Sequence, residues 1–149
     1  MRTVNQITIH APWEKVFKAA AQAEAWPAML PHYRRVKVLA SNGKGTRRIV
    51  DMAAHRDGFP CRWRSEQLID KKAKKIYYLH VKSFWTQGMH VWWILKPKGK
   101  HKTEILLTHD QEGPGGFNEW FLQKVVLDQF VHNIAGKTLA GLKRHLEAA

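Results

Sequence analysis

The pattern that decides the fold is clearest in the ten residues Cys61-Arg62-Trp63-Arg64-Ser65-Glu66-Gln67-Leu68-Ile69-Asp70. Successive side chains of a β-strand point to opposite faces of the sheet, so residues two apart share one environment. The odd set runs from Cys61 through Trp63, Ser65 and Gln67 to Ile69, whereas the even set carries Arg and Glu. We therefore predict a strand over 61–70 whose odd positions face the interior.

Segments with the same period of two lie on both sides of this stretch. The gaps between them are short and polar, which is typical of hairpins in a meandering antiparallel sheet. In the segment 89–96 the odd positions face inward, which leaves Trp92 on the outer face, whereas in 76–83 the inward set stays open. The predicted strands are 3–10, 33–39, 46–54, 61–70, 76–83, 89–96 and 104–110.

Helical spacing appears at two places in the chain. A short helix is predicted to begin at Pro12, and a second one lies within 23–30, limited by Pro27 and Pro31. After the break Gly113-Pro114-Gly115-Gly116 we predict one long helix, in which Gly136 and Gly141 indicate a bend or close packing. Its apolar stripe consists of Phe117, Trp120, Phe121, Leu127, Phe130, Val131, Ile134 and Leu142.

The order of elements defines the expected architecture. One strand, two short helices, six strands and one long helix predict an α+β protein. Its seven-stranded antiparallel sheet would wrap around the C-terminal helix, with an internal cavity between the two. A chain of 149 residues and 17.3 kDa fits a single domain over 1–149.

Composition excludes several classes of protein. The chain is 44% hydrophobic and 25% charged, and no apolar run approaches the roughly 20 residues that span a bilayer. The N-terminus lacks an export signal, so we expect a cytoplasmic protein. The lone Cys61 excludes an intrachain disulfide and a Cys-cluster zinc site. Nine His residues show no compact ligand spacing, so we expect no metal and no cofactor.

Five short motifs follow one another along nearly the whole chain. They are Ile9-His10-Ala11-Pro12-Trp13-Glu14-Lys15-Val16-Phe17, then Ala25-Trp26-Pro27-Ala28-Met29-Leu30-Pro31-His32-Tyr33, then Arg62-Trp63-Arg64-Ser65-Glu66-Gln67, then Gln87-Gly88-Met89-His90-Val91-Trp92-Trp93 with Leu106-Leu107-Thr108-His109-Asp110, and finally Thr138-Leu139-Ala140-Gly141-Leu142-Lys143. In this order the sequence resembles the START-like helix-grip superfamily, and within it the polyketide cyclase/aromatase group.

The resemblance implies a set of catalytic residues. The cyclases carry a Trp-x-Ser-x-Arg strand pattern, which Trp63 and Ser65 match while Gln67 stands at the Arg position. Gln67 can donate a hydrogen bond to a carbonyl but carries no charge. Tyr33 can donate a proton to a carbonyl, and His80, with an ordinary pKa near ~6.5, can exchange protons. The candidate catalytic residues are therefore Tyr33, Ser65, Gln67 and His80.

An aromatic-lined pocket is also implied. The candidate ligand-binding residues are Trp26, Trp63, Tyr78, Met89, Trp93, Phe117, Phe121, Phe130 and Asn133. On an inward face, Trp63 and Trp93 are explained as well by packing in the core as by contact with a ligand. His80 and His109 are likewise explained as buried residues of the sheet rather than as catalysts.

Two functions follow from this pocket. The first is a polyketide cyclase/aromatase that cyclises and dehydrates a poly-β-ketone held on a carrier protein. The second is non-catalytic binding or transport of a quinone, lipid or sterol-like molecule.

The net charge of +13 attracts polyanions. It concentrates at 71–75 and 96–102, both predicted hairpin turns, so solvated tips explain it as well as a docking surface does. The possible polyanionic partners are an acidic acyl carrier protein, RNA and the surface of an anionic membrane, to which the protein would bind peripherally. Inward-facing Trp residues argue against nucleic acid, because single-strand binders need exposed aromatic rings. An exposed Trp85 or Trp92 would mark a homodimer face.

Overall fold

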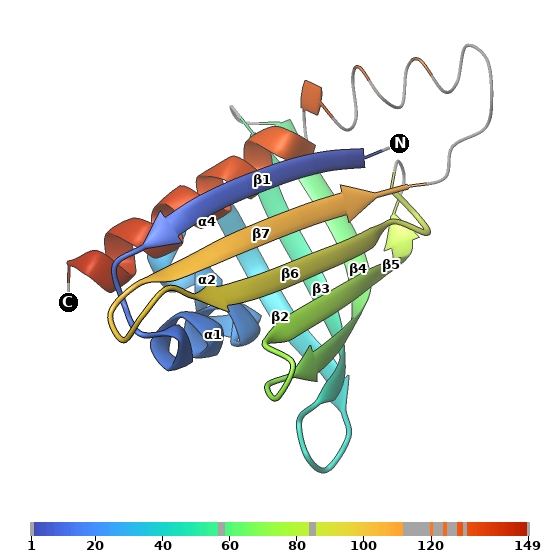
Figure 1. Cartoon of the computed structure of the whole chain (residues 1–149). Helices are drawn as coiled ribbons and strands as arrows, with labels where there is room; N and C mark the ends of the chain where they lie inside the picture. The colour runs from blue at the N-terminus through green and yellow to red at the C-terminus, as the bar shows by residue number, and fades with distance from the viewer. Residues whose placement is uncertain are drawn as a thin grey trace.

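A single curved antiparallel sheet dominates the computed structural model, which describes residues 2–56, 59–83, 86–111, 120, 124, 128–129 and 131–148. Its seven strands lie in the order β1-β7-β6-β5-β4-β3-β2, so β7 closes back onto β1 and the other neighbours are successive hairpins (Figure 1). The predicted sheet is confirmed. The strands are β1 (Arg2–Ile9), β2 (Tyr33–Ser41), β3 (Arg47–Arg56), β4 (Phe59–Asp70), β5 (Lys75–Ser83), β6 (His90–Pro97) and β7 (Thr103–Asp110).

The two predicted short helices follow β1. Helix α1 (Trp13–Ala21) begins after Pro12, and Val16, Phe17, Ala20 and Ala21 form its buried face. The second segment divides into the 3₁₀ turn η1 (Ala23–Ala25) and helix α2 (Trp26–Met29), which has a proline in its first turn. Together they lie across one end of the sheet (Figure 1).

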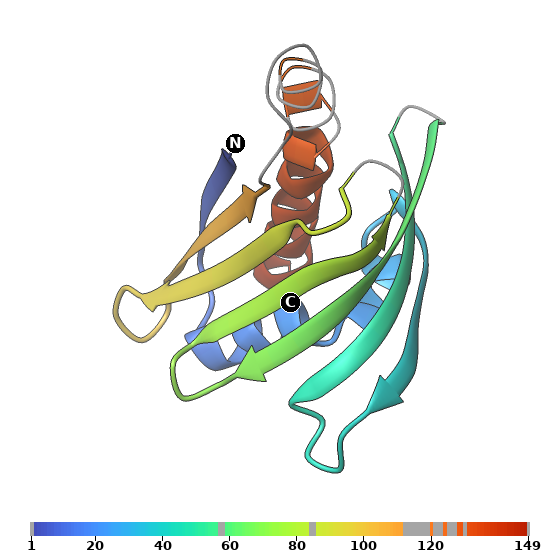
Figure 2. The same ribbon diagram turned by 90° about the vertical axis from the view of Figure 1, so that its right-hand side faces the viewer.

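Helix α4 (His132–Glu147) lies inside the curve of the sheet, as Figure 2 shows. Polar contacts attach it to the edge strand β1 along its length. Asn5 donates to the carbonyl of His132 at 3.2 Å, and the Lys143 amine donates to the carbonyl of Thr8 at 2.7 Å. The C-terminal helix of the predicted architecture is confirmed.

Part of the predicted long helix lies outside the described residues. Phe117, Phe121, Leu127 and Phe130 belong to that part. Trp120, expected on the buried stripe, is 58% exposed, so the prediction for this side chain is wrong. Val131, Ile134 and Leu142 lie on the side of the helix that packs against the core.

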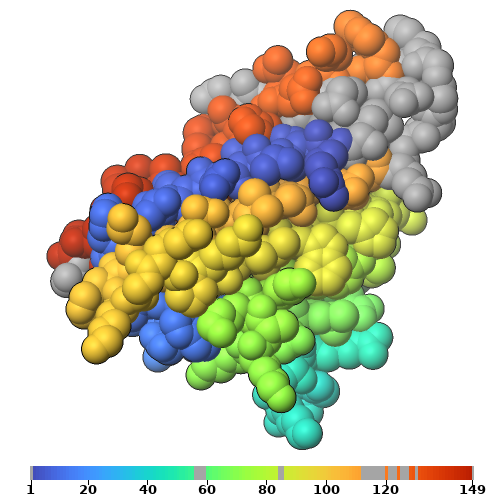
Figure 3. All heavy atoms as spheres, viewed as in Figure 1, coloured from blue at the N-terminus to red at the C-terminus, as the bar shows by residue number. Residues whose placement is uncertain are grey.

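Strand parity follows the sequence pattern. On β4, Ser65 and Gln67 are fully buried, and on β6 the buried set is Val91, Trp93 and Leu95. The parity left open on β5 is settled by Ile76, Tyr78 and His80, which are buried. Trp92 points outward, is 40% exposed and lies 4.6 Å from Tyr77 between ring centroids. Figure 3 views this outer face, over which the side chains of β5, β6 and β7 are spread.

Candidate functional site

Four aromatic side chains from different elements pack into a continuous group. Trp26 lies 5.1 Å from Tyr33, 5.6 Å from Trp93 and 6.5 Å from Tyr78 between ring centroids. The indole N–H of Trp26 donates to the carbonyl of Ala19 at 3.0 Å, which fixes its ring. All four rings are buried, so the structure brings these candidate residues together as a wall of the core.

Trp63 extends this wall and keeps part of its surface exposed. Its ring lies 6.2 Å from Tyr33 and stacks on the imidazole of His80 at 5.8 Å, with 17° between the planes. Trp63 is half-buried, unlike Trp93 at 3% exposure. Trp63 is therefore the ring of this group with surface left for another molecule, whereas Met89, at 0% exposure, is core.

Ser65 and His80 are direct neighbours across β4 and β5. The imidazole Nδ1 of His80 is hydrogen-bonded to the Thr86 hydroxyl at 2.8 Å, and Thr86 in turn contacts Ser83 at 2.7 Å. The hydroxyl of Ser65 is buried and has no hydrogen-bond partner in the described part of the chain. Two of the four candidate catalytic residues thus lie side by side on the inner face of the sheet.

The near-neutral pKa expected for His80 is wrong. The pKa of His80 is lowered to about 3, mainly by burial and also by the nearby His109. The sequence left the inward set of 76–83 open and carried no signal of how completely the neighbours of His80 exclude water. His80 is consequently a neutral imidazole at physiological pH, able to share a hydrogen bond but poorly able to hold a second proton.

His109 on β7 belongs to the same inner face. Burial lowers the pKa of His109 to about 3 as well, with His132 adding to the effect. Sequence reasoning assigned no ligand-binding role to His109, although its parity with Ile105 and Leu107 indicated an inward position.

Among the buried polar atoms that lack hydrogen-bond partners in the described residues, three lie on the inner face of the sheet or on the helix inside its curve. They are the Ser65 hydroxyl on β4, the His109 Nδ1 on β7 and the Asn133 amide oxygen on α4. Buried polar groups in proteins are nearly always hydrogen-bonded. A bound molecule with carbonyl or hydroxyl groups would supply the missing partners.

Gln67 is already fully engaged. Its side-chain amide donates to the Tyr78 hydroxyl at 2.8 Å and to the carbonyl of Ala21 at 3.0 Å. Its oxygen accepts from the Arg48 Nε at 2.7 Å. The structure therefore ties Gln67 to its neighbours, and its catalytic role stays a prediction.

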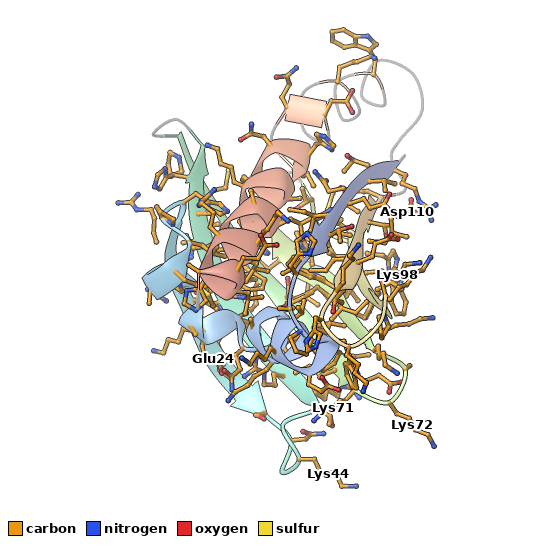
Figure 4. The ribbon with its side chains drawn as sticks, turned by 60° about the vertical axis from the view of Figure 1, so that its left-hand side comes forward. Glu24, Lys44, Lys71, Lys72, Lys98 and Asp110 are labelled. Carbon is orange, nitrogen blue, oxygen red and sulfur yellow. The ribbon has the colours of Figure 1, made fainter. Side chains whose placement is uncertain are left out.

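Arg48 is a buried cation that sequence reasoning missed. It shares the parity of the inward residues Val50 and Met52, which was the available signal. The guanidinium is held by Glu24 at 2.6 and 3.2 Å. Burial alone would raise the pKa of Glu24, but the hydrogen bond from Arg48, a backbone hydrogen bond and the charge of Arg48 together outweigh it and lower the pKa. Figure 4 labels Glu24 beside the short helices.

Tyr33 and Tyr78 keep their protons at any physiological pH. Burial raises the pKa of both phenols far above the ordinary value, although Thr138 beside Tyr33 and Gln67 beside Tyr78 act in the opposite direction. Each can donate a hydrogen bond without ionising.

The described residues contain no group of three His, Cys, Asp or Glu side chains placed to hold a metal ion. None of the helices described is both long and apolar enough to cross a membrane. Of the remaining candidate ligand residues, Asn133 lies on the first turn of α4, whereas Phe117, Phe121 and Phe130 lie outside the described residues.

Residues 9–141 match the protein family described as polyketide cyclase / dehydrase and lipid transport. The chain belongs to this family, as its motifs predicted. A relative from Streptomyces violaceoruber, the granaticin polyketide synthase bifunctional cyclase/dehydratase, is 27% identical over 109 residues. That match covers 72% of this chain and 33% of the relative, so the chain spans about a third of its length.

Two solved structures share the fold over almost the whole chain. A protein from Thermus thermophilus has a TM-score of 0.82 at 22% identity, covering 99% of this chain and 98% of its own. The Zhui aromatase/cyclase from a Streptomyces strain has a TM-score of 0.76 at 17% identity, covering 100% and 98% respectively. At these identities the likeness concerns the fold.

Proposed function

We propose that this protein is a polyketide cyclase/aromatase that folds a carrier-bound poly-β-ketone against Trp63 and promotes its cyclisation and dehydration. The observation that carries the proposal is the set of unpartnered buried polar atoms on Ser65, His109 and Asn133. A poly-β-ketone presents carbonyl oxygens and enol hydroxyls at every second carbon, which suits donors and acceptors spread over facing elements. The proposal includes an internal cavity between α4 and the sheet, in which the poly-β-ketone would bind.

The chemistry available is that of neutral hydrogen-bonding groups. In an aldol closure, an enol or enolate carbon attacks a carbonyl carbon, and charge develops on the carbonyl oxygen. Hydrogen bonds from Tyr33 and Ser65 would stabilise that oxygen in a site shielded from water. His80, held by Thr86, would share a hydrogen bond with an enol rather than act as an acid of near-neutral pKa. Holding one chain conformation would supply much of the acceleration.

A product assay tests this proposal. A synthetic poly-β-ketone thioester is incubated with the protein, and the ring products are separated and compared with those formed spontaneously. We expect one regioisomer to be enriched, and Tyr33→Phe and Ser65→Ala to remove the enrichment. Tyr77→Phe, on the outer face, is the matched control and should leave it unchanged. A product distribution identical to the spontaneous one would refute the cyclase.

A specific observation favours the second function, binding of a quinone, lipid or sterol-like molecule. The inner-face histidines His80 and His109 have pKa values of about 3, so neither exchanges protons readily near neutral pH. The family description also includes lipid transport. Saturable quenching of Trp fluorescence by a quinone, together with no ring product from the thioester, would select this function.

An acidic partner suits the outer surface. Arg35, Arg62 and Arg64 surround a single buried carboxylate, Asp51, at N–O distances of 3.2, 3.1 and 3.6 Å. Lys71 and Lys72 project from the β4–β5 turn, as Figure 4 shows. We propose that this charge steers an acidic acyl carrier protein, because complementary fields raise encounter rates at low salt. We also propose that a homodimer, if it forms, uses the face that carries Trp92, whose side chain points outward and is 40% exposed. Trp85, the other candidate for this face, lies outside the described residues.

A further inference from the structure

A groove lies where α4 passes the segment that joins α2 to β2. Its volume is about 360 Å³, and its lining residues are Pro31, His32, His55, Lys137, Ala140 and Arg144. This lining holds two cationic side chains, two imidazoles and no carboxylate. The composition is that of an anion site.

The helix brings the two cations to one side. Residues 137, 140 and 144 recur at intervals of three and four, which places them on a single face of α4. The strands bring the two imidazoles together, because the backbone N–H of His55 donates to the carbonyl of His32 at 2.8 Å. Side chains from α4, from β3 and from the segment before β2 therefore meet in one groove, with Lys137 and Arg144 as its cationic donors.

The imidazoles have donor and acceptor capacity in reserve. The Nδ1 of His55 is buried and has no hydrogen-bond partner among the described residues. His32 is 6% exposed, and its Nε2 is hydrogen-bonded to the Thr138 hydroxyl at 2.9 Å. Because Thr138 donates to the carbonyl of Ile134, its oxygen accepts from His32, which leaves the other ring nitrogen of His32 as an acceptor.

Electrostatics favour an incoming anion. The pKa of His32 is lowered to about 4, mainly by burial and also by the charges of Lys137, His55 and Arg144, whereas a backbone hydrogen bond to Ile134 acts in the opposite direction. These groups, from α4 and β3, make the groove a region of positive potential. An anion would relieve that potential and raise the pKa of His32.

We propose that this groove binds the phosphate group of a phosphate ester. A guanidinium offers paired donors that match phosphate oxygens, and an amine and an imidazole can reach the oxygens that remain. The volume corresponds to roughly a dozen water molecules at ~30 Å³ each, so it accommodates an organic group beside the phosphate.

The groove is also linked to the proposed active site. The rings of His32 and Tyr33 lie 4.7 Å apart, and Thr138 contacts both side chains. In this respect the inference rests on the proposed function: a phosphodiester in the arm that joins the polyketide to its carrier would be held next to Tyr33. The alternative source of the same chemistry is a free, small phosphate ester.

Titration with inorganic phosphate and methyl phosphate tests the site without any need for turnover. The probe is the imidazole NMR signals of His32 and His55, followed at constant ionic strength with chloride as the reference anion. We expect saturable shifts of both signals, and Arg144→Gln should weaken binding roughly tenfold, the loss of one charge-assisted contact. Lys137→Gln provides an independent second variant.

Lys44→Gln is the matched control, because Lys44 is an exposed cation in the β2–β3 turn (Figure 4). It removes the same charge and should change the affinity less than about twofold. Linear, unsaturated shifts, or equal weakening by Arg144→Gln and Lys44→Gln, would overturn the site. Either result would leave the cyclase proposal standing.

A kinetic comparison distinguishes the two sources of phosphate. Model thioesters are prepared with and without a phosphodiester in the arm. If the arm is the ligand, Arg144→Gln raises KM roughly tenfold for the phosphate-bearing substrate alone. Equal KM changes for both substrates, with methyl phosphate binding retained, would refute the arm and identify a free phosphate ester as the ligand.

Discussion

The side-chain amide of Gln67 donates a hydrogen bond to the hydroxyl of Tyr78, 2.8 Å away, inside the core of the sheet. The other end of the same amide accepts from Arg48. Gln67 is neutral, and the cation that it contacts, Arg48, comes from the neighbouring strand β3. Gln67 therefore joins the Arg48–Glu24 ion pair, whose carboxylate is exposed, to the aromatic wall.

Replacing Gln67 by Leu should destabilise the protein substantially. Leu fills a similar volume but leaves the Arg48 Nε and the Tyr78 hydroxyl without this partner, whereas the Ala21 carbonyl keeps its hydrogen bond from the Arg48 guanidinium. Each buried group left unsatisfied costs about 1–3 kcal/mol, and partial relaxation brings the expected total to roughly 3 kcal/mol.

The measurement is the free energy of unfolding of Gln67→Leu in urea. Gln6→Leu, the same change at an exposed position on β1, should cost less than about 0.5 kcal/mol. Equal effects of the two variants would contradict this role of Gln67.

The two strands β4 and β5 show what the sequence could and could not predict. Alternation placed Trp63, Ser65 and Gln67 inward because the opposite set is mainly charged. On β5 both sets hold aromatic residues, so only the pairing of Tyr78 with Gln67 decides which face is buried. Parity gives the direction of a side chain but not its hydrogen-bond partners. The ion pair of Arg48 with Glu24 depends on where η1 meets β3, and no local pattern records that.

Trp63 and Trp93 should respond differently to truncation, although the sequence treats them alike. Trp93→Ala removes a ring that is 3% exposed and packed on Trp26, so we expect a loss of about 3–5 kcal/mol of stability. Trp63→Ala removes a half-buried ring, and its main effect should be on ligand affinity. The measurements are thermal unfolding and titration with an aromatic ligand such as a quinone.

The ligand titration decides between a binding surface and core filling at Trp63. If Trp63→Ala loses as much stability as Trp93→Ala and still binds the ligand with unchanged affinity, Trp63 is core filling. Trp92→Ala, on the outer face, is the matched control and should change neither property strongly.

Stability should fall as the pH drops below about 6.5. The pKa values of His32, His80 and His109 are lowered from 6.5 to about 4, 3 and 3 respectively, in each case mainly by burial. Between the ordinary and the lowered pKa the unfolded chain binds protons that the folded chain does not, so acid favours unfolding. Above about pH 6.5 neither state is protonated at these sites, and their contribution is constant. Each such histidine adds a slope of at most about 1.4 kcal/mol per pH unit.

The measurement is the free energy of unfolding in urea from pH 8 to pH 5.5, where most carboxylates remain ionised. His80→Gln should reduce the slope below pH 6.5 by up to one proton equivalent. His101→Gln, at an exposed hairpin position, serves as the comparison and should leave the slope unchanged. A wild-type stability that is flat across this range would show that these rings are accessible to water.

Close packing at Gly141, rather than at Gly136, should limit changes in α4. A Cβ added at Gly141 would overlap the Leu30 Cδ2, and Leu30 is fully buried at the end of α2. A Cβ at Gly136 would lie 3.4 Å from the Asn5 amide nitrogen, which is ordinary contact. Ala is favoured over Gly in a helix by about 1 kcal/mol, so Gly136→Ala should be neutral or slightly stabilising. Gly141→Ala should cost about 1–3 kcal/mol, because overpacking outweighs the same helical gain.

Unfolding in urea compares the stability of the two variants. A double-mutant cycle with Leu30→Ala tests the cause, since the penalty at Gly141 should disappear once the Leu side chain is gone. A penalty that persists in the Leu30→Ala background would mean that Gly141 is required for a reason other than its approach to α2.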